Sequence, residues 1–459
     1  MALIEKLQDI VGPKGYLSGS NIGERYTTDV SGRRYGTPTL VLRPASTEEV
    51  SEILAACHEA GQPVLTQGGM TGLVQGGLPL DGEIVLSLER MNAVEEIDKP
   101  GGTATVQAGV VLQTFQETLD KDHLMFPLDL GARGSCTIGG NMATNAGGNR
   151  VLRYGMTRDL VLGVEAVLAD GTVVGGLNRL IKNNTGYDLK QLFIGSEGTL
   201  GVITRAVLKV FPKPRSQSVA FCELSGYSAV VNLLNFVRER LPGTLSAFEV
   251  MWQSFYQRAL EINPGLPKPF EPNSPFYVIV ETQGGDKDAD DQAFQGTLEA
   301  ALEKGLVADA VIAKSEQEAK GLWSIRDSSL EVYQSLAPGK SYDVSLPLSE
   351  IEGFAERLKT ELDERWPGNA MVLFGHLGDG NVHPLTNAGN GAAEVDELLY
   401  NLVGDLGGSI SAEHGIGLSR RGYLGLSQSD ADIELMRTMK AALDPKNILN
   451  PGRVIEMDG

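Results

Sequence analysis

Residues 63–77, PVLTQGGMTGLVQGG, run from a short apolar segment into a loop that has five glycines in twelve residues. The apolar segment predicts a strand. Glycine permits positive φ and close backbone approach, so the loop can direct successive N–H groups at a pyrophosphate. If this were the only glycine cluster in the chain, a flexible surface loop would be an equally good interpretation.

Two further segments of small residues follow, GARGSCTIGGNMATNAGGN (131–149) and GSEGTLGVIT (195–204). None of the three is a GxGxxG opening a helix or a GxxxxGK[ST], so neither a Rossmann dinucleotide site nor a P-loop is indicated. Three such loops within about 140 residues predict one long phosphate-containing cofactor that lies across them.

In this order, the three segments resemble the FAD-binding domain of the vanillyl-alcohol oxidase type flavoproteins over residues 37–212. The resemblance implies FAD, with its pyrophosphate on the first two loops and its adenosine or flavin side at the third. Met70 stands where members that bind flavin covalently often have histidine, so the FAD is expected to be non-covalent. The cofactor-binding residues that we expect are Gly68, Gly69, Met70, Thr71, Gly72, Leu73, Ser135, Thr137, Gly139, Gly140, Asn141, Asn145, Gly147, Gly201, Val202, Ile203 and, in the C-terminal segment, Asn450.

Strand and helix signals before the first loop predict α/β structure. The run 39–46 predicts a strand, and Ser46 with Glu49 forms a capping box for a helix that Gly61 ends. Farther along, VLGVEAVLADGTVV (161–174) predicts a β-hairpin with an Asp-Gly turn.

Prolines at 212 and 214 mark a boundary, after which helical stretches alternate with strands such as PFYVIVETQ. The predicted fold class is α+β: a vanillyl-alcohol oxidase type FAD-binding domain, an α+β substrate (cap) domain and a C-terminal helical segment. The expected domains are residues 1–215 for FAD, 216–415 for substrate and the metal site, and 416–459 returning to the FAD domain.

The segment MVLFGHLGDGNVHP (371–384) holds two of the five histidines of the chain. An Asp379-Gly380 type I′ turn would pair His376 directly with His383, with Cβ atoms about 4.5–5.5 Å apart on one face of the hairpin. Glu413 in SISAEHGIG can complete a His-His-Glu set with open coordination positions. Histidines that only satisfy hydrogen bonds are the alternative, but three of five histidines in two glycine-rich motifs favour a metal site.

Three more residues are candidates for chemistry around this predicted metal site. His414 faces away from its neighbour Glu413 if both lie in a strand, and an imidazole can accept a proton near neutral pH, so it is the candidate general base. A hydrogen-bonding role beside the metal is its alternative. Arg326 and Lys340 are candidates to bind a substrate carboxylate, against the alternative of solvated surface charges.

Together, FGHLGDGNVH, SISAEHGIG and WSIRD with GKSYDVSLP resemble the FAD-dependent D-2-hydroxyacid dehydrogenases. This group contains D-2-hydroxyglutarate dehydrogenases, flavin D-lactate dehydrogenases and the glycolate oxidase catalytic subunit. The resemblance implies a metal on His376, His383 and Glu413, hydride transfer to flavin N5, proton removal by His414, and an electron-transfer flavoprotein or quinone as acceptor. The His-His-Glu set suits zinc best, and manganese or cobalt would also fit.

The substrate is less sharply indicated than the reaction. Leu330 and Leu385 stand where the hydroxyglutarate enzymes usually have threonine and asparagine, and both changes remove polar groups that could serve a carboxylate. D-2-hydroxyglutarate is ranked first, with D-lactate or glycolate as the alternative. A non-catalytic FAD-binding accessory subunit is a third interpretation, but such a subunit is expected to lose the histidine and glutamate set.

Charge and cysteine content limit partners and location. The formal net charge of −20 offers no basic excess for nucleic acid or an anionic membrane. Three widely spaced cysteines without a CxxC motif indicate a reducing compartment, and with no signal peptide or membrane span recognised, a cytoplasmic protein is expected. The oligomeric state is left open, with a homodimer as one option.

Overall fold

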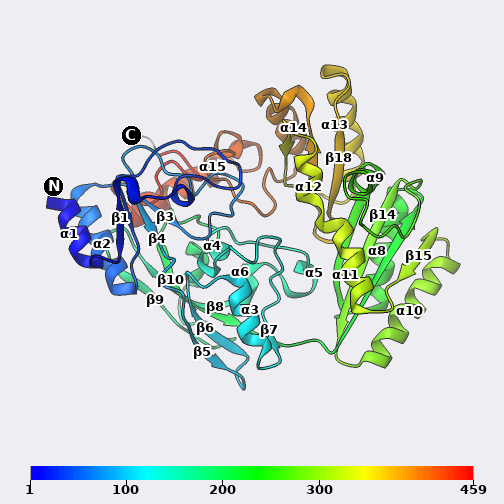
Figure 1. The fold of residues 1–459 in the computed structure, drawn as a ribbon, viewed down its shortest axis with the longest axis horizontal. Helices are drawn as coiled ribbons and strands as arrows, with labels where there is room; N and C mark the ends of the chain where they lie inside the picture. The colour runs from blue at the N-terminus through cyan, green and yellow to red at the C-terminus, as the bar shows by residue number, and fades with distance from the viewer. Residues whose placement is uncertain (1, 458–459) are drawn as a thin grey trace. The chain divides into compact units, whose positions relative to one another are not determined.

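The computed structural model describes residues 2–457, and these form two compact units (Figure 1). The first unit contains the chain up to Gly148, the segment Gly155–Lys213 and the chain from Glu413 onward. The second contains Asn149–Tyr154 and Pro214–Ala412. The chain therefore crosses between the units after Lys213 and after Ala412, and twice more around a short excursion that the sequence did not indicate. The functional domains expected with bounds at 215 and 415 stay predictions.

The first unit contains a four-stranded sheet, a five-stranded sheet and a separate two-stranded pair. In the four-stranded sheet, β2 (Leu40–Leu42) and β3 (Val64–Gln67) each pair in parallel with β4 (Ile84–Ser87), as expected of a strand–helix–strand unit. The five-stranded sheet is antiparallel in the order β5-β6-β10-β8-β9. The other elements of this unit are α1 (Ala2–Val11), β1 (Tyr16–Ser18), α2 (Thr47–Ala60), β5 (Val94–Asp98), β6 (Thr103–Gln107), α3 (Leu112–Asp120), β7 (Leu124–Met125), α4 (Ile138–Ala143), α6 (Thr157–Leu160), β8 (Val161–Val167), β9 (Val173–Gly176), α7 (Lys190–Phe193), β10 (Val202–Lys209), β11 (Phe211–Pro212) and α15 (Asp430–Leu443).

Local signals in the sequence account for several of these boundaries. The Ser46 side chain accepts the N–H of Glu49 at the start of α2, and Gly61 ends this helix in the left-handed region with φ 66°. The predicted hairpin is present as β8 and β9, with Val167 paired to Val173. The N-cap at Ser46 and the hairpin are confirmed, because each depends on contacts within a few residues of the chain. The other half of the predicted capping box is not formed, since the Glu49 carboxylate accepts the N–H of Ala45 at 2.8 Å instead of that of Ser46.

The second unit is an eight-stranded sheet covered by helices. Its strands run in the order β15-β12-β14-β13-β18-β19-β16, and β17 pairs with β19. The core lies between this sheet and the helices α9 and α11, with Phe255, Ile325 and Phe374 among its buried residues. The elements are α5 (Val151–Tyr154), β12 (Ser216–Leu224), α8 (Tyr227–Arg240), β13 (Leu245–Trp252), α9 (Gln253–Ile262), β14 (Phe276–Gly284), α10 (Lys287–Glu303), β15 (Asp309–Ile312), α11 (Glu316–Asp327), α12 (Ser329–Gln334), β16 (Lys340–Ser341), β17 (Val344–Ser345), α13 (Ile351–Arg365), β18 (Met371–His376), β19 (Asn381–Thr386) and α14 (Ala393–Asp405).

The excursion Asn149–Tyr154 is fixed to the second unit by polar contacts. Arg150 Nε donates to Glu281 Oε1 at 3.0 Å, and Tyr154 Oη donates to Gln283 Oε1 at 3.0 Å. Glu281 has no exposed surface and also accepts from Trp323 Nε1 at 3.1 Å. A buried carboxylate needs such partners, because burying an unpaired charge is costly.

The C-terminal helix α15, drawn in red in Figure 1, belongs to the same unit as the N-terminal strands. Its buried Lys440 donates through Nζ to Asp444 Oδ2, to Thr199 O at 2.9 Å and to Leu449 O at 2.7 Å. Burial lowers the pKa of Lys440, and the neighbouring Asp444 carboxylate opposes this shift. The hydrogen bond to Thr199 O therefore joins α15 to the third glycine-rich loop. Within residues 2–457 no helix has both the length and the apolar character that crossing a bilayer requires.

We expect Asp444→Ala to lower the free energy of unfolding of the first unit by about 3–5 kcal/mol, because it leaves the buried Lys440 ammonium without its carboxylate. Urea unfolding followed by far-UV circular dichroism measures this change. All three tryptophans lie in the second unit, so their fluorescence shows whether that unit is affected. Lys446→Ala, at an exposed lysine, is the control, and a shift no larger than in the control would contradict the prediction.

Candidate active site

The first two glycine-rich loops touch through their backbones. A Cβ at position 69 would lie 2.1 Å from Ser135 O, and one at position 68 would lie 2.6 Å from Thr137 Oγ1. No side chain fits at these contacts. Asn450 brings the third loop to the same place, since its Oδ1 accepts the N–H of Thr66 at 2.8 Å and its Nδ2 donates to Glu197 O at 2.7 Å. The loops that the sequence predicted to share one cofactor therefore converge.

The polar groups at this convergence fit a phosphate-containing cofactor such as FAD. Within residues 2–457, Thr66 Oγ1 and Gln67 Oε1 are buried and have no hydrogen-bond partner. Such atoms in a native structure call for a further partner. Thr66 Oγ1 can donate to a phosphate oxygen, whereas Gln67 Oε1 can only accept, for example from a hydroxyl group of the cofactor. Around Gly72 a Cβ would meet nothing within 4 Å, so the outer part of the first loop leaves room. Neither of the first two loops contains an acidic residue that would repel a pyrophosphate.

Some expected cofactor residues have side chains engaged elsewhere. Asn145 Oδ1 accepts the N–H of Arg158 at 2.9 Å, and Val202 belongs to the apolar core of the unit. A Cβ at Gly77 would lie 2.9 Å from Met70 Sδ, so the Met70 side chain folds back over its own loop. Val202 could therefore serve a cofactor through its backbone only. Asn145 would keep Nδ2, which lies 3.6 Å from Met156 Sδ, as a side-chain donor.

The histidine hairpin has a different register from the predicted one. His376 pairs with Asn381 and Phe374 with His383, because residues Leu377–Asp379 form a 3-10 turn that Gly380 closes with φ 79°. The direct pairing of His376 with His383 through a two-residue turn is therefore wrong. The error is a shift of two residues, so both imidazoles still share one face, with ring centroids 5.3 Å apart.

Each of these histidines has a buried carboxylate on its Nδ1 side. His376 Nδ1 lies 2.7 Å from Glu249 Oε1, and His383 Nδ1 lies 4.0 Å from Asp343 Oδ1. A carboxylate can only accept here, so His376 Nδ1 carries the proton and Nε2 keeps a lone pair. A histidine that binds a metal is commonly held in this way by a carboxylate behind it.

A third ligand group completes a candidate metal centre. The possible ligand atoms of His376, His383 and Glu413 all lie within 4.8 Å of one another. Ligands about 2.0–2.2 Å from a tetrahedral zinc ion lie roughly 3.4 Å apart, so a small adjustment would close the set. Glu413 directly follows a segment in which Ser409 exchanges two backbone hydrogen bonds with Ser345, at 2.8 and 3.0 Å. This bridge holds the chain that leads into Glu413.

Arg326 lies beside the histidines, whereas Lys340 does not. The Arg326 guanidinium is buried, donates to Glu249 Oε2 at 2.9 Å and to His376 Nε2 at 3.1 Å, and lies over the Phe374 ring. Burial raises the pKa of Glu249, but His376 and Arg326 outweigh burial, so this pKa lies below its ordinary value. Lys340 instead forms an ion pair with Asp396 of α14.

The sequence prediction missed Glu249 and Asp343. Both had a signal, since each is an acidic residue inside a strand-like apolar stretch, LSAFEVMW (245–252) and SYDVSLP (341–347). A charge in such a stretch must be buried with a partner or lie at the surface. Only the folded structure shows that Glu249 and Asp343 are buried.

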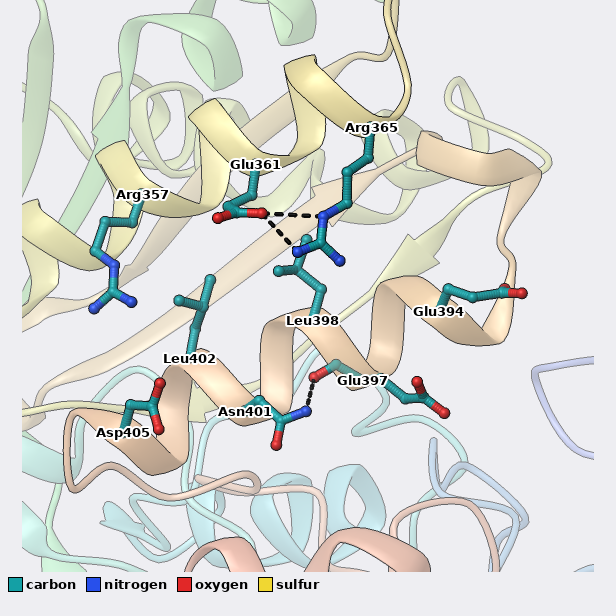
Figure 2. A pocket seen from close by; sticks show the side chains of 9 residues that line it. All are labelled: Arg357, Glu361, Arg365, Glu394, Glu397, Leu398, Asn401, Leu402 and Asp405. Carbon is teal, nitrogen blue, oxygen red and sulfur yellow. Dashed lines mark hydrogen bonds and ion pairs between the residues drawn. The ribbon is translucent and has the colours of Figure 1, made fainter.

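A separate surface cleft of about 400 Å³ lies between α13 and α14 of the second unit (Figure 2). Its charges are mixed, and the Arg365 guanidinium is already paired with Glu361. None of the predicted site residues lines it. The residues that do are Arg357, Glu361, Arg365, Glu394, Glu397, Leu398, Asn401, Leu402 and Asp405.

Comparison with known proteins agrees with this geometry. Residues 38–175 match the family model described as an FAD binding domain, and residues 213–454 match the C-terminal domain of FAD linked oxidases. The chain belongs to the FAD-linked oxidase family. It is therefore an FAD-dependent oxidoreductase, as the resemblance implied, and FAD is its cofactor.

Relatives of this oxidase include two curated mitochondrial proteins. A Bos taurus protein named mitochondrial D-2-hydroxyglutarate dehydrogenase is 42% identical over 92% of this chain and 77% of its own length. A putative mitochondrial D-lactate dehydrogenase of Schizosaccharomyces pombe is 40% identical over 94% of this chain and 84% of its own length. The crystal structure of p-cresol methylhydroxylase has the same fold, with a TM-score of 0.81 at 18% identity over 100% of this chain and 98% of that one. The vanillyl-alcohol oxidase type fold is thus confirmed.

These names also correct the expected location. The relatives from cattle and fission yeast are both named mitochondrial, so the expectation of a cytoplasmic oxidase is wrong. The three cysteines are buried and unpaired in the structure, and unpaired cysteines do not distinguish one reducing compartment from another.

We expect Gly69→Ala to weaken FAD binding at least about tenfold, because the added methyl group would force the first loop away from Ser135 O. Titration of FAD into the apoprotein, followed by the change in flavin fluorescence, measures the dissociation constant. Gly131→Ala is the matched control, since a Cβ there would meet nothing within 4 Å. Equal affinity in the two variants would show that the close contact of the loops is not needed for FAD.

Proposed function

We propose that this chain is an FAD- and metal-dependent dehydrogenase that oxidises a D-2-hydroxyacid to the 2-oxoacid, with D-2-hydroxyglutarate as the first candidate. The observation that carries the proposal is the His376, His383 and Glu413 set, in which both imidazoles have a buried carboxylate behind them. The names of relatives at about 40% identity support the substrate class.

When bound, the FAD supplies a hydride acceptor at N5, and a divalent metal, for which zinc suits the ligand set, lowers the pKa of the substrate hydroxyl. His376, His383 and Glu413 would hold the metal. His414 would accept the hydroxyl proton at a ring nitrogen while the hydride leaves C2. The hydride from C2 and the proton from the hydroxyl would thus leave the substrate by separate routes.

Arg326 is the better candidate for the substrate carboxylate. Glu249 fixes its guanidinium close to the histidines, and a guanidinium can bind a carboxylate through two parallel hydrogen bonds. A metal on His376 Nε2 would take the lone pair that now accepts from Arg326, which would leave this N–H for the substrate. Lys340 is a weaker candidate, since its ammonium is already neutralised by Asp396, which also accepts from Tyr342 Oη at 2.7 Å. A role for Lys340 would require that pair to open.

The choice between a dicarboxylate and a monocarboxylate substrate is the second question. Leu385 is buried in the apolar core with Ile325, and the Leu330 side chain is 60% exposed. Neither offers a polar atom to a second carboxylate, which favours D-lactate or glycolate as the alternative substrate. We also propose an electron-transfer flavoprotein or quinone as acceptor, and a homodimer stays a prediction.

Anaerobic addition of D-2-hydroxyglutarate, D-lactate, D-malate and glycolate, each in turn, tests the proposal. Bleaching of the flavin absorbance by at least one acid is expected, and His376→Ala should slow it at least about 100-fold with FAD still bound. His58→Ala, in α2 of the first unit, is the control. No bleaching by any of the four acids would sink the dehydrogenase proposal, and an unaffected His376→Ala variant would point to an accessory role.

Glu249→Gln should lower the affinity for zinc about 10- to 100-fold, because the carboxylate that orients His376 is lost. Competition with a coloured zinc chelator measures this affinity without any turnover. Glu223→Gln, at a half-buried position on β12 of the same sheet, is the matched control. Unchanged zinc affinity in Glu249→Gln would mean that the carboxylate does not support a metal ligand.

A further inference from the structure

Glu197, in the third glycine-rich loop, has a backbone conformation that is unusual for a residue with a side chain. Its φ is 51°, in the left-handed region. Its N–H donates to Ala143 O at 2.8 Å, and its carbonyl accepts from Asn450 Nδ2 at 2.7 Å. A strained residue persists where its surroundings determine it from several sides, and such residues cluster at functional sites.

The Glu197 carboxylate binds the loop that carries the two catalytic candidates. Oε1 accepts the N–H of Ile416 at 2.6 Å, and Oε2 accepts the N–H of Gly417 at 3.0 Å. These amides follow Glu413 and His414 by only two to four residues. One side chain thus holds both amides at once, and charge-assisted bonds of this kind are stronger than neutral ones.

Two glycines let the loop close around this carboxylate. A Cβ at Gly415 would lie 2.6 Å from Glu197 Oε1, and one at Gly417 would lie 2.2 Å from Val74 O. Both glycines have positive φ, at 84° and 53°. The N–H of Leu418 also donates to Val74 O at 3.0 Å, so the same loop is fastened to the first glycine-rich loop.

Keeping this carboxyl group here has an energetic cost. Burial raises the pKa of Glu197 to about 7, although the two amides and Arg420 act in the opposite direction. A side chain that served only to fill space would avoid this cost, and perturbed carboxyl groups are found preferentially at functional sites.

We infer that Glu197 is a positioning residue that holds Glu413 and His414 in their working geometry by binding the amides of Ile416 and Gly417. This inference rests on the proposed function for the roles of Glu413 and His414. Glu197 itself need touch neither metal nor substrate. It links the third glycine-rich loop, on the cofactor side, to the loop that would carry the base.

Glu197→Gln tests the inference, since glutamine has the same shape but only one acceptor oxygen, and its amide group would face a backbone N–H. We expect kcat to fall about 30- to 100-fold with KM changed less than about threefold, because a small misplacement of a catalytic group has effects of this size. Hydrogen exchange of the peptide that contains Ile416 and Gly417 should become faster while FAD stays bound. Glu165→Gln, at a half-buried glutamate of the same unit that binds Thr47 and Thr204, should leave all these quantities unchanged.

The outcomes separate the two ideas. A normal kcat in Glu197→Gln, or unchanged hydrogen exchange around Ile416, would overturn the positioning role while the proposed function stands. Loss of FAD from the variant would also overturn it, because Glu197 would then act on the cofactor loop. If the wild type oxidises none of the acids, the proposed function fails, and the exchange measurement alone then decides whether Glu197 holds the loop.

Discussion

The close backbone contact between the first two glycine-rich loops is the constraint on which the rest of the molecule depends. Gly68 and Gly69 can approach Thr137 and Ser135 only because they lack a Cβ. Asn450 then holds the third loop against the start of the first, through bonds at 2.8 and 2.7 Å. Residues from the beginning, middle and end of the chain therefore meet at these loops, where the sequence predicts the FAD site.

Buried carboxylates of several kinds recur throughout the structure, and each is satisfied by a different partner. Glu249 uses an imidazole and a guanidinium, Glu197 uses two backbone amides, and Asp444 uses the Lys440 ammonium. A buried pair of this kind adds little net stability, but removing one partner is costly. These groups therefore fix geometry more than they add stability, which suits a site that must orient ligands and a base.

The sequence predicted what depends on local chemistry. The cap at Ser46, the hairpin at 161–174 and the shared face of His376 and His383 all follow from residue spacing, and the structure confirms them. The predicted register of the other hairpin, which carries His376 and His383, was wrong. A longer turn is compatible with the same Asp-Gly signal. Partners from distant strands and helices, such as Glu249 for His376, required the tertiary fold. The roles assigned to His414, Arg326 and Lys340 stay predictions.

The short excursion Asn149–Tyr154 limits how recombination can exchange one unit of this protein for that of a relative. Because the chain enters the second unit, leaves it and enters it again, neither unit corresponds to one uninterrupted coding segment. A recombination that exchanged residues 214–412 for those of another oxidase would bring in a new Glu281 position but keep the old Arg150. An exchange of residues 214–412 would therefore keep such contacts only if the six residues 149–154 changed with them.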